Sequence, residues 1–182
     1  MYYRDQAEEL RNIVRQQNQI HVTNAKVLTV TSGKFGRVFG GNDEGGSING
    51  SITVNAYEDG CRPLIIGELY GGGYQAPYSV YGCTQSGDTW TANESGTLHF
   101  DQETRGRAAI EVNVFSCTSI GKVFGGGYGA TARVVGNTNV WINTMKGTVD
   151  GTMQPSIGKI GQVFGGGNAA TVNGSTHVNI GT

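Results

Sequence analysis

The residues of this sequence best suited to metal chemistry form an acidic, glycine-rich loop, Asn42-Asp43-Glu44-Gly45-Gly46. Calcium takes about six to eight oxygen ligands, which carboxylate and amide groups in such a loop can supply. Asp43 and Glu44 provide only two carboxylates, and the same residues also suit an ordinary exposed turn. Glu58-Asp59-Gly60 is a weaker example of the same kind. We therefore expect no obligatory cofactor, and if Ca²⁺ binds, we expect Asp43 and Glu44 to be its ligands.

A second charged cluster, which combines acids with arginines, could carry out acid–base catalysis. Its members are Asp101, Glu103, Arg105 and Arg107. A polysaccharide lyase or glycoside hydrolase needs such groups for proton transfer and carboxylate neutralisation. Alternating signs are equally typical of a solvated loop, and the chain has no G-x-S-x-G or H-E-x-x-H motif and no Ser/His/Asp grouping. We expect a protein without enzymatic activity and assign no catalytic residue; the alternative is a carbohydrate-active enzyme on a parallel β-helix.

Aromatic residues gather near the middle of the chain, at Tyr70, Tyr74, Tyr78, Tyr81 and Trp90. Aromatic faces with Asn, Gln and Thr nearby suit the recognition of sugars or proteins. The same side chains could instead pack an inserted segment against the rest of the fold. The predicted ligand-binding residues are Tyr74, Tyr78, Tyr81 and Trp90, and the predicted partner is a glycan or a protein.

Two further motifs have simpler explanations. Gly71 to Ala76 fits the G-x-G-x-x-A fingerprint of dinucleotide sites, but two more segments of the chain fit it as well, and a strand-like segment, not a helix, follows each. We expect no nucleotide site. Cys61, Cys83 and Cys117 lie far apart and lack metal-ligand spacing. They are either small buried residues, or two of them form a disulfide and leave one free thiol.

The elements that would position these residues come from a repeated phrase. It consists of an apolar residue, Gly, a polar residue, Val or Leu, an aromatic residue and a run of glycines. Its four copies predict equivalent structural positions at Val38-Phe39, Leu69-Tyr70, Val123-Phe124 and Val163-Phe164.

A second phrase, a Gly-polar turn followed by polar/apolar alternation, comes after three of the four copies, as in Gly174-Ser175-Thr176-His177-Val178. Alternation of period two predicts half-buried strands. Together the phrases predict an all-β chain folded as a parallel β-solenoid, in which successive coils stack like residues on one another. An antiparallel β-sandwich or barrel is the alternative. The glycine runs would lie where the chain turns through positive φ or where coils approach closely.

The predicted domain organisation has two parts. Tyr3, Ala7, Leu10 and Val14 fall on one face of a helix, which predicts an amphipathic helix over residues 1–20. We expect it to cap the open end of the stack. Residues 21–182 form the Gly-rich β-repeat domain, with an insertion at about 75–106 that accounts for the irregular spacing of the copies.

The composition excludes several other classes of protein. Of 182 residues, 31 are Gly and only 3 are Pro, and the net charge is −1. The glycines have no every-third-residue pattern, which excludes collagen, and dispersed apolar residues with little net charge argue against disorder. A near-neutral chain has no general attraction for nucleic acid or anionic lipid. It also contains no apolar run long enough to insert into a membrane.

The ends of the chain bear on its location. The start, MYYRDQAEEL, lacks the apolar core of a signal peptide. The chain ends at Gly181-Thr182, directly after a strand-like segment. These ends fit either an intracellular protein or a piece of a longer secreted protein. The abrupt end favours the piece of a longer secreted protein, whose open β-edge would also allow self-association.

The phrases IGKVFGGGYGATARVVGNTNVWIN and IGQVFGGGNAATVNGSTHVNIGT resemble the Gly-rich tandem units of large surface or secreted proteins of gut-dwelling Gram-negative anaerobes. The resemblance covers about residues 24–182. It implies a β-rich, solenoidal stalk or adhesin segment at the cell surface or outside the cell, and it transfers no catalytic residue. The expected function is that of a non-catalytic scaffold or adhesin that binds glycans or host proteins.

Overall fold

The computed structural model describes residues 26–60, 62–98, 108–142 and 157–181. These residues contain strands and no helix, so the fold is all-β as predicted. The helix predicted over residues 1–20 lies outside the described residues. The strands are β1 (Lys26–Val30), β2 (Gly33–Phe39), β3 (Ile52–Tyr57), β4 (Leu64–Tyr70), β5 (Tyr78–Ser79), β6 (Cys83–Ser86), β7 (Thr89–Ala92), β8 (Ile110–Phe124), β9 (Val134–Val135), β10 (Thr138–Ile142), β11 (Ile157–Phe164), β12 (Val172–Asn173) and β13 (Thr176–Ile180).

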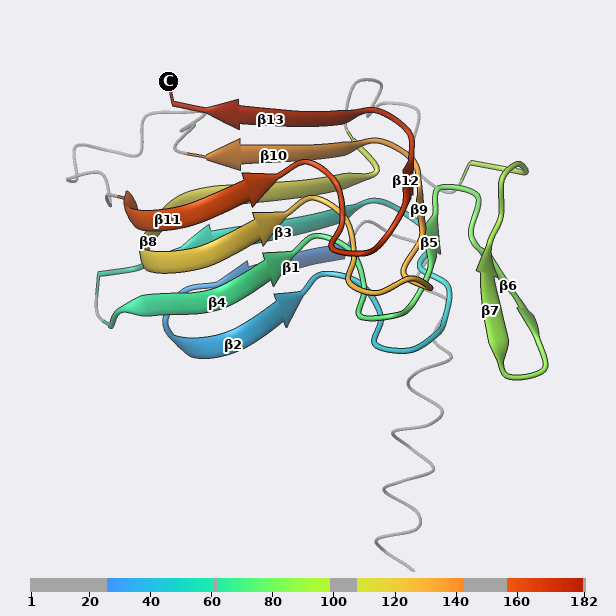
Figure 1. Ribbon diagram of the computed structural model, residues 1–182, viewed down its shortest axis with the longest axis horizontal. Helices are drawn as coiled ribbons and strands as arrows, with labels where there is room; N and C mark the ends of the chain where they lie inside the picture. The colour runs from blue at the N-terminus through green and yellow to red at the C-terminus, as the bar shows by residue number, and fades with distance from the viewer. Residues whose placement is uncertain (1–25, 61, 99–107, 143–156, 182) are drawn as a thin grey trace, which may run out of the picture.

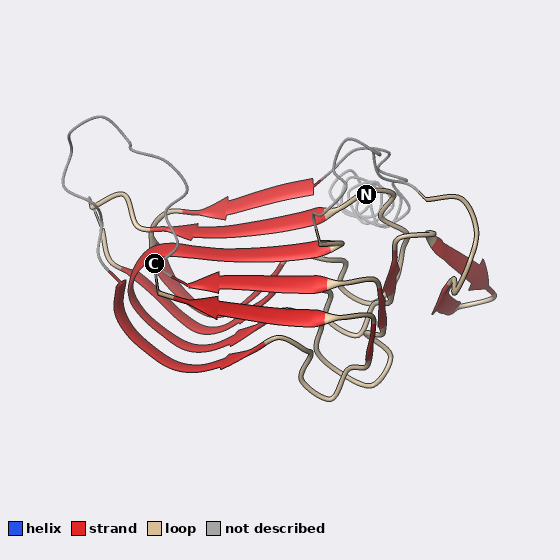
Figure 2. Cartoon of the chain, turned by 90° about the horizontal axis from the view of Figure 1, so that it is seen from above, coloured by secondary structure: helices blue, strands red, loops and turns tan. Residues whose placement is uncertain are grey.

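Most of these strands pair in three parallel ladders (Figure 1). The first ladder has the order β1, β3, β8, β10, β13, and the second has the order β2, β4, β8, β11. The long strand β8 belongs to both, its first half to the first ladder and its second half to the second. The third ladder is short and contains β5, β9 and β12. The flat strands of the first ladder face the curved strands of the second (Figure 2).

From β3 to β12 the chain passes through the first, second and third ladders in turn, whereas no described strand of the third ladder lies between β2 and β3. From β8 it continues to β9 in the third ladder and then returns to the first ladder as β10, beside the first half of β8. We call one such passage a layer. Equivalent positions of the repeated phrase pair across layers, Val38 with Leu69, Leu69 with Val123, and Val123 with Val163.

The alternative of an antiparallel sandwich or barrel is wrong. Among the described strands, only the β6–β7 hairpin pairs antiparallel. The physical reason is the repeat itself, because parallel in-register pairing places identical phrases side by side, whereas antiparallel pairing would set glycine runs against large side chains. The hairpin and β5 both lie in the segment predicted as an insertion, but β5 is a rung of the third ladder.

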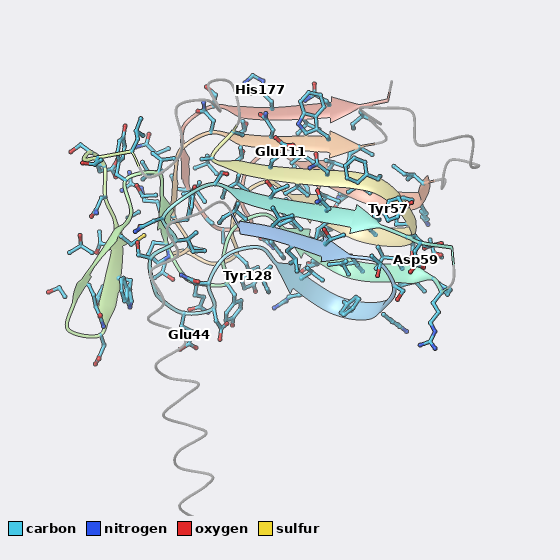
Figure 3. All side chains as sticks on the ribbon, turned by 180° about the vertical axis from the view of Figure 1, so that it is seen from behind. Glu44, Tyr57, Asp59, Glu111, Tyr128 and His177 are labelled. Carbon is cyan, nitrogen blue, oxygen red and sulfur yellow. The ribbon has the colours of Figure 1, made fainter. Side chains whose placement is uncertain are left out.

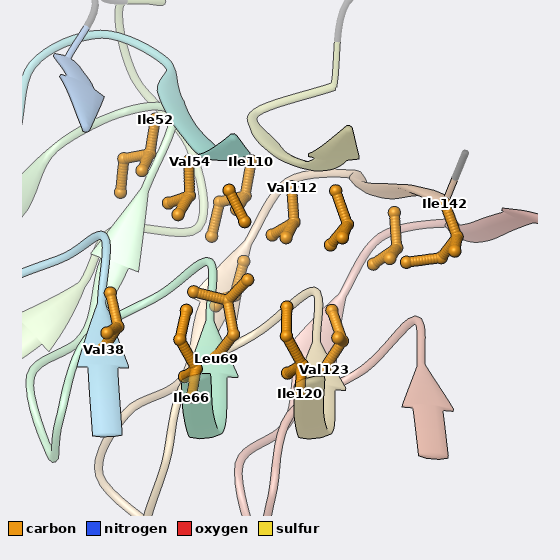
Figure 4. Close-up of a cluster of buried hydrophobic side chains, with 14 of the residues drawn as sticks. Val38, Ile52, Val54, Ile66, Leu69, Ile110, Val112, Ile120, Val123 and Ile142 are labelled. Carbon is orange, nitrogen blue, oxygen red and sulfur yellow. The ribbon is translucent and has the colours of Figure 1, made fainter. Parts of the chain in front are cut away.

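The core lies between the first and second ladders (Figure 4). Alternation along β3 and β8 turns Val54 and Val112 inward, and both side chains are 0% exposed. They face Leu69 and Val123 of the second ladder, which are also fully buried. Each such side chain contributes roughly 1.5–3 kcal/mol on burial.

The glycine runs serve close approach, not reversal of the chain. A Cβ on Gly40 would lie 2.5 Å from the carbonyl oxygen of Gly71, and a Cβ on Gly71 would lie 2.5 Å from that of Gly125. Positive φ occurs outside the runs, for example at the turns that open the second phrase, where Gly50 has φ 130° and Gly136 has φ 136°. We expected the runs to lie either at turns with positive φ or where layers approach closely, and the structure shows the close approach.

Candidate functional site

Tyr78 is a buried anchor of the fold and not an exposed binding residue. It begins the short strand β5, and its side chain is only 2% exposed. Its hydroxyl donates to the carbonyl oxygens of Gly50 at 2.7 Å and Ala109 at 3.2 Å. Burial raises the pKa of the Tyr78 hydroxyl. These bonds connect three segments of the chain, so Tyr78 has no free face for a ligand.

Tyr81 and Trp90 are both half-buried at the β6–β7 hairpin. Trp90 lies on β7, and its indole ring packs so closely against Gly45 that a Cβ there would be 2.6 Å from Nε1. The hairpin is also tied to the chain before it, because the Asn93 side chain donates to the Tyr81 carbonyl oxygen at 3.3 Å. The structure therefore brings Trp90 to the acidic loop, a contact that sequence spacing alone does not reveal.

The acidic loop itself presents Asp43 and Glu44 to solvent. In the part of the chain that the structure describes, no group of three or more His, Cys, Asp and Glu side chains is gathered as metal ligands. Figure 3 shows Glu44 far from the carboxylates of Asp59 and Glu111. A calcium ion here would depend on backbone oxygens and water in addition to the two side chains.

The aromatic positions of the repeated phrase form one column on the outer face of the second ladder. The rings of Phe39, Tyr70, Phe124 and Phe164 stack with centroid separations of 4.8, 4.7 and 4.8 Å. These four residues are the aromatic column. They point outward because the preceding residue of each phrase, such as Val38, points into the core.

Tyr74 and Tyr128 lie over this column as a second aromatic cluster. Their rings stack on each other at 5.5 Å, and Tyr74 meets Phe39 edge-on at 5.5 Å. Tyr128 meets Tyr70 edge-on at 5.7 Å. Tyr74 thus belongs to a different cluster from Tyr78, Tyr81 and Trp90, so the four predicted ligand-binding residues do not share one site.

A charged cluster borders the aromatic column at Glu68. Its carboxylate accepts hydrogen bonds from Arg37 Nε at 2.9 Å and from the Tyr70 hydroxyl at 3.0 Å, and Lys122 Nζ lies 3.6 Å away. The Arg37 guanidinium also lies 4.6 Å from the centre of the Tyr128 ring, within the range of a cation–π contact. The polar position of the repeated phrase supplies Arg37, Glu68 and Lys122, so aligning the copies in register would have revealed this cluster from sequence.

The pKa shifts of Glu68 and Tyr70 argue against a role for this cluster in acid–base catalysis. Partial burial opposes ionisation of Glu68, but hydrogen bonds from Tyr70 and Arg37 and the charges of Arg37 and Lys122 outweigh it and lower the Glu68 pKa. Burial, reinforced by the Glu68 carboxylate, raises the pKa of Tyr70 to about 12, although the Asn168 side chain donates to its oxygen at 3.1 Å. A paired carboxylate and a protonated phenol are poor proton carriers near neutral pH.

Glu58, from the weaker acidic loop, connects layers of the fold. Its carboxylate accepts the N–H of Leu64 at 2.6 Å, the N–H of Thr118 at 2.6 Å and the Thr118 hydroxyl at 2.9 Å. The bond from Leu64 is the main cause of the lowered Glu58 pKa, and the bonds from Thr118 add to it. The carboxylate therefore acts as a hydrogen-bonding brace in a half-buried corner.

The remaining candidates from the sequence are the charged cluster at residues 101–107 and the cysteines. The cluster at residues 101–107 lies outside the described residues, as does Cys61. Cys83 and Cys117 are free thiols, and burial raises the pKa of each to about 11, which keeps them protonated and poorly nucleophilic.

Over the described ranges, no helix has the length and apolar character needed to cross a bilayer. Comparison with known proteins found no matching family model, no matching curated protein and no matching solved structure.

Proposed function

We propose that this chain is a non-catalytic structural module, a β-solenoid segment of a surface or secreted protein that acts as a scaffold or adhesin. The observation that carries the proposal is the register of the second ladder. Each paired position of the repeated phrase lies beside the same position of the phrase in the next layer. Repeat proteins built this way form elongated bodies in which each layer is stabilised by its neighbours. The location at the surface rests on the resemblance of the repeated phrases.

The charged side chains support a structural role. Glu68 is held between Arg37 and Lys122, and Glu58 is held by Leu64 and Thr118. These bonds favour the charged form of each carboxylate and lower its pKa, which makes both groups poor proton donors near neutral pH. Both groups stabilise contacts between layers instead.

Removing one whole layer tests the solenoid and scaffold proposal. Deletion of residues 52–109 joins Ser51 to Ile110, the register partner of Ile52. In the shortened chain Val38 would meet Val123 in place of Leu69. We expect it to fold with a β-type circular dichroism spectrum and to unfold cooperatively at a lower denaturant midpoint.

The matched control deletes residues 52–110, one residue more. A shift of one residue turns the apolar face of the joined strand outward, so this chain should lose its cooperative transition. An unfolded 52–109 deletion, or equal behaviour of the two deletions, would show that layers are not interchangeable and would contradict the proposal.

The hairpin is the face that we propose for ligand display, because Trp90 and Tyr81 lie half-buried where the chain departs from the ladders. On an array of glycans and extracellular proteins, Trp90→Ala should weaken binding of any ligand that the wild type retains by about ten-fold or more, as loss of an aromatic anchor does. Tyr57→Ala removes another aromatic side chain, 37% exposed at the end of β3, and should leave binding unchanged.

Three results of this screen would change the assignment. Equal loss in both variants would remove the display site from the hairpin. Retention of no ligand by the wild type would leave the scaffold role without the adhesin role. Cleavage of any polysaccharide on the array by the wild type would replace the proposal with the carbohydrate-active alternative.

A further inference from the structure

Tyr74 and Tyr128 occupy the same position in two neighbouring layers. Each follows the glycine run of its phrase, Tyr74 after β4 and Tyr128 after β8, and their backbones pair in register as a parallel bridge. The Tyr128 N–H donates to the Gly73 carbonyl oxygen at 2.9 Å, and the Gln75 N–H donates to the Tyr128 carbonyl oxygen at 2.8 Å. Since neighbouring strands lie about 4.8 Å apart, this pairing holds two phenol side chains side by side.

The rings of these two tyrosines are stacked. Their centroids are 5.5 Å apart and their planes are 9° from parallel. The aromatic column beneath orients both rings, because Phe39 meets Tyr74 edge-on and Tyr70 meets Tyr128 edge-on. Both side chains are half-buried, so a small oxidant in solution can reach them. In the part of the chain that the structure describes, no other two tyrosines stack on each other.

We propose that Tyr74 and Tyr128 form a site of oxidative cross-linking, at which a one-electron oxidant of the peroxidase type joins two layers through dityrosine. Each phenol loses one electron and one proton, and the two phenoxyl radicals form a carbon–carbon bond between ring carbons next to the hydroxyl groups. The hydrogen on each of these carbons then moves to the neighbouring oxygen, which restores both phenols. Hydrogen peroxide takes up the two electrons and two protons and becomes two molecules of water.

The surroundings of the other described tyrosines make this pair the favoured one. Tyr70 is 0% exposed, and Phe39 and Phe124 stack on its ring. Tyr78 is buried as well, with its hydroxyl engaged by two backbone carbonyl groups. Tyr57 is 37% exposed, but no ring contact joins it to another tyrosine among the described residues. Coupling within one molecule requires both accessibility and a tyrosine partner, which Tyr74 and Tyr128 combine.

The cross-link would connect interior layers covalently. Because Tyr74 and Tyr128 are far apart in the sequence, a bond between them restricts the unfolded chain, as a disulfide does. We expect the cross-linked chain to unfold at a higher denaturant midpoint than the untreated chain. The inference goes beyond the proposed scaffold function, which does not need a cross-link.

The experiment treats the dilute full chain with a haem peroxidase and hydrogen peroxide. Dityrosine is followed by its blue fluorescence and, in mass spectra, by the loss of two hydrogen atoms. We expect a product that migrates as a monomer on a denaturing gel, with a yield that does not depend on protein concentration. Tyr74→Phe and Tyr128→Phe keep an aromatic ring but remove one of the two phenols, so each should lose this product. Tyr57→Phe removes an exposed tyrosine outside the pair and should leave the yield unchanged.

Three results would overturn the inference. A wild type that gives no dityrosine, or only cross-linked oligomers, would show that the pair does not couple. Monomeric product that persists in either Tyr74→Phe or Tyr128→Phe would place the cross-link elsewhere. An equal yield from the wild type unfolded in urea would show that the fold does not bring the two phenols together. None of these results alters the outcome of the layer-deletion test, which involves no oxidation.

Discussion

At the scale of single residues, polar side chains in this fold act mainly between layers. Glu58 accepts hydrogen bonds from two separate strands, and Glu68 receives a hydrogen bond or ion pair from the layer on either side of it. Asn113 likewise donates to Asn55 Oδ1 at 3.0 Å on the adjacent strand. The outer face is therefore a set of side-chain ladders, each held by the register of the backbone beneath it.

The Glu58 brace makes stability depend on pH. Because its hydrogen bonds lower the folded-state pKa, Glu58 contributes stability at a pH above its unfolded pKa, and this contribution is lost as the pH falls through the folded pKa. We expect Glu58→Gln to reduce the free energy of unfolding by ~1 kcal/mol at pH 7, a value discounted for partial exposure. Its difference from the wild type should shrink below about pH 4.

Urea denaturation followed by circular dichroism across this pH range measures the effect. Glu44→Gln is the control, because Glu44 is an exposed carboxylate in the acidic loop. A difference between Glu58→Gln and the wild type that stays constant with pH would show that the carboxylate charge does not matter.

At the scale of elements, the strands obey two constraints from different parts of the sequence. Period-two alternation in the second phrase sets which residues of β3, β10 and β13 face the core, and the same alternation is visible in the sequence. The glycine runs have no such periodic signal. Their role follows from the distance between layers, which is known only when the layers are in place.

The glycine runs predict a sharp contrast between interior and end positions. Gly72→Ala would place a Cβ 2.8 Å from the Gly127 nitrogen, so the layers must part, and we expect a loss of about 1–3 kcal/mol in the free energy of unfolding. Gly166 is the equivalent residue of the last copy, and a Cβ built on it meets no described atom within 4 Å. Gly166→Ala should be neutral or stabilising by about 0.4–1 kcal/mol, because it reduces the entropy of the unfolded chain.

Chemical denaturation at a concentration where the chain is monomeric compares the two variants directly. Equal destabilisation would indicate that both glycines are needed for backbone conformation and not for the approach of layers. A stable Gly72→Ala protein would contradict the close packing itself.

At the scale of the whole molecule, stability should be graded along the stack. The inward side chains of β8, such as Val112 and Val123, are 0% exposed because layers cover them on both sides. Among the described residues, those of the end strands have strand neighbours on one side only, and Val178 is 40% exposed. In a repeat architecture each layer is stabilised by the interfaces it shares, so the ends open first.

Amide hydrogen exchange tests this gradient. We expect slowest exchange in β8 and its neighbours β3 and β4, and faster exchange in β1 and β13, with protection falling layer by layer. Uniform protection across all strands would instead indicate a single cooperative unit.

The sequence by itself determined the all-β class, the alternation that builds the core, and the equivalence of the four phrases, because these depend on local spacing and on repetition. It also identified the aromatic column residues as equivalent positions, though not as a stack. Only the tertiary structure decided that the strands are parallel, that Tyr78 is buried while Trp90 packs on Gly45, and that the glycine runs serve close approach. The physical reason is that these properties depend on distances between layers, which residues far apart in the chain set together.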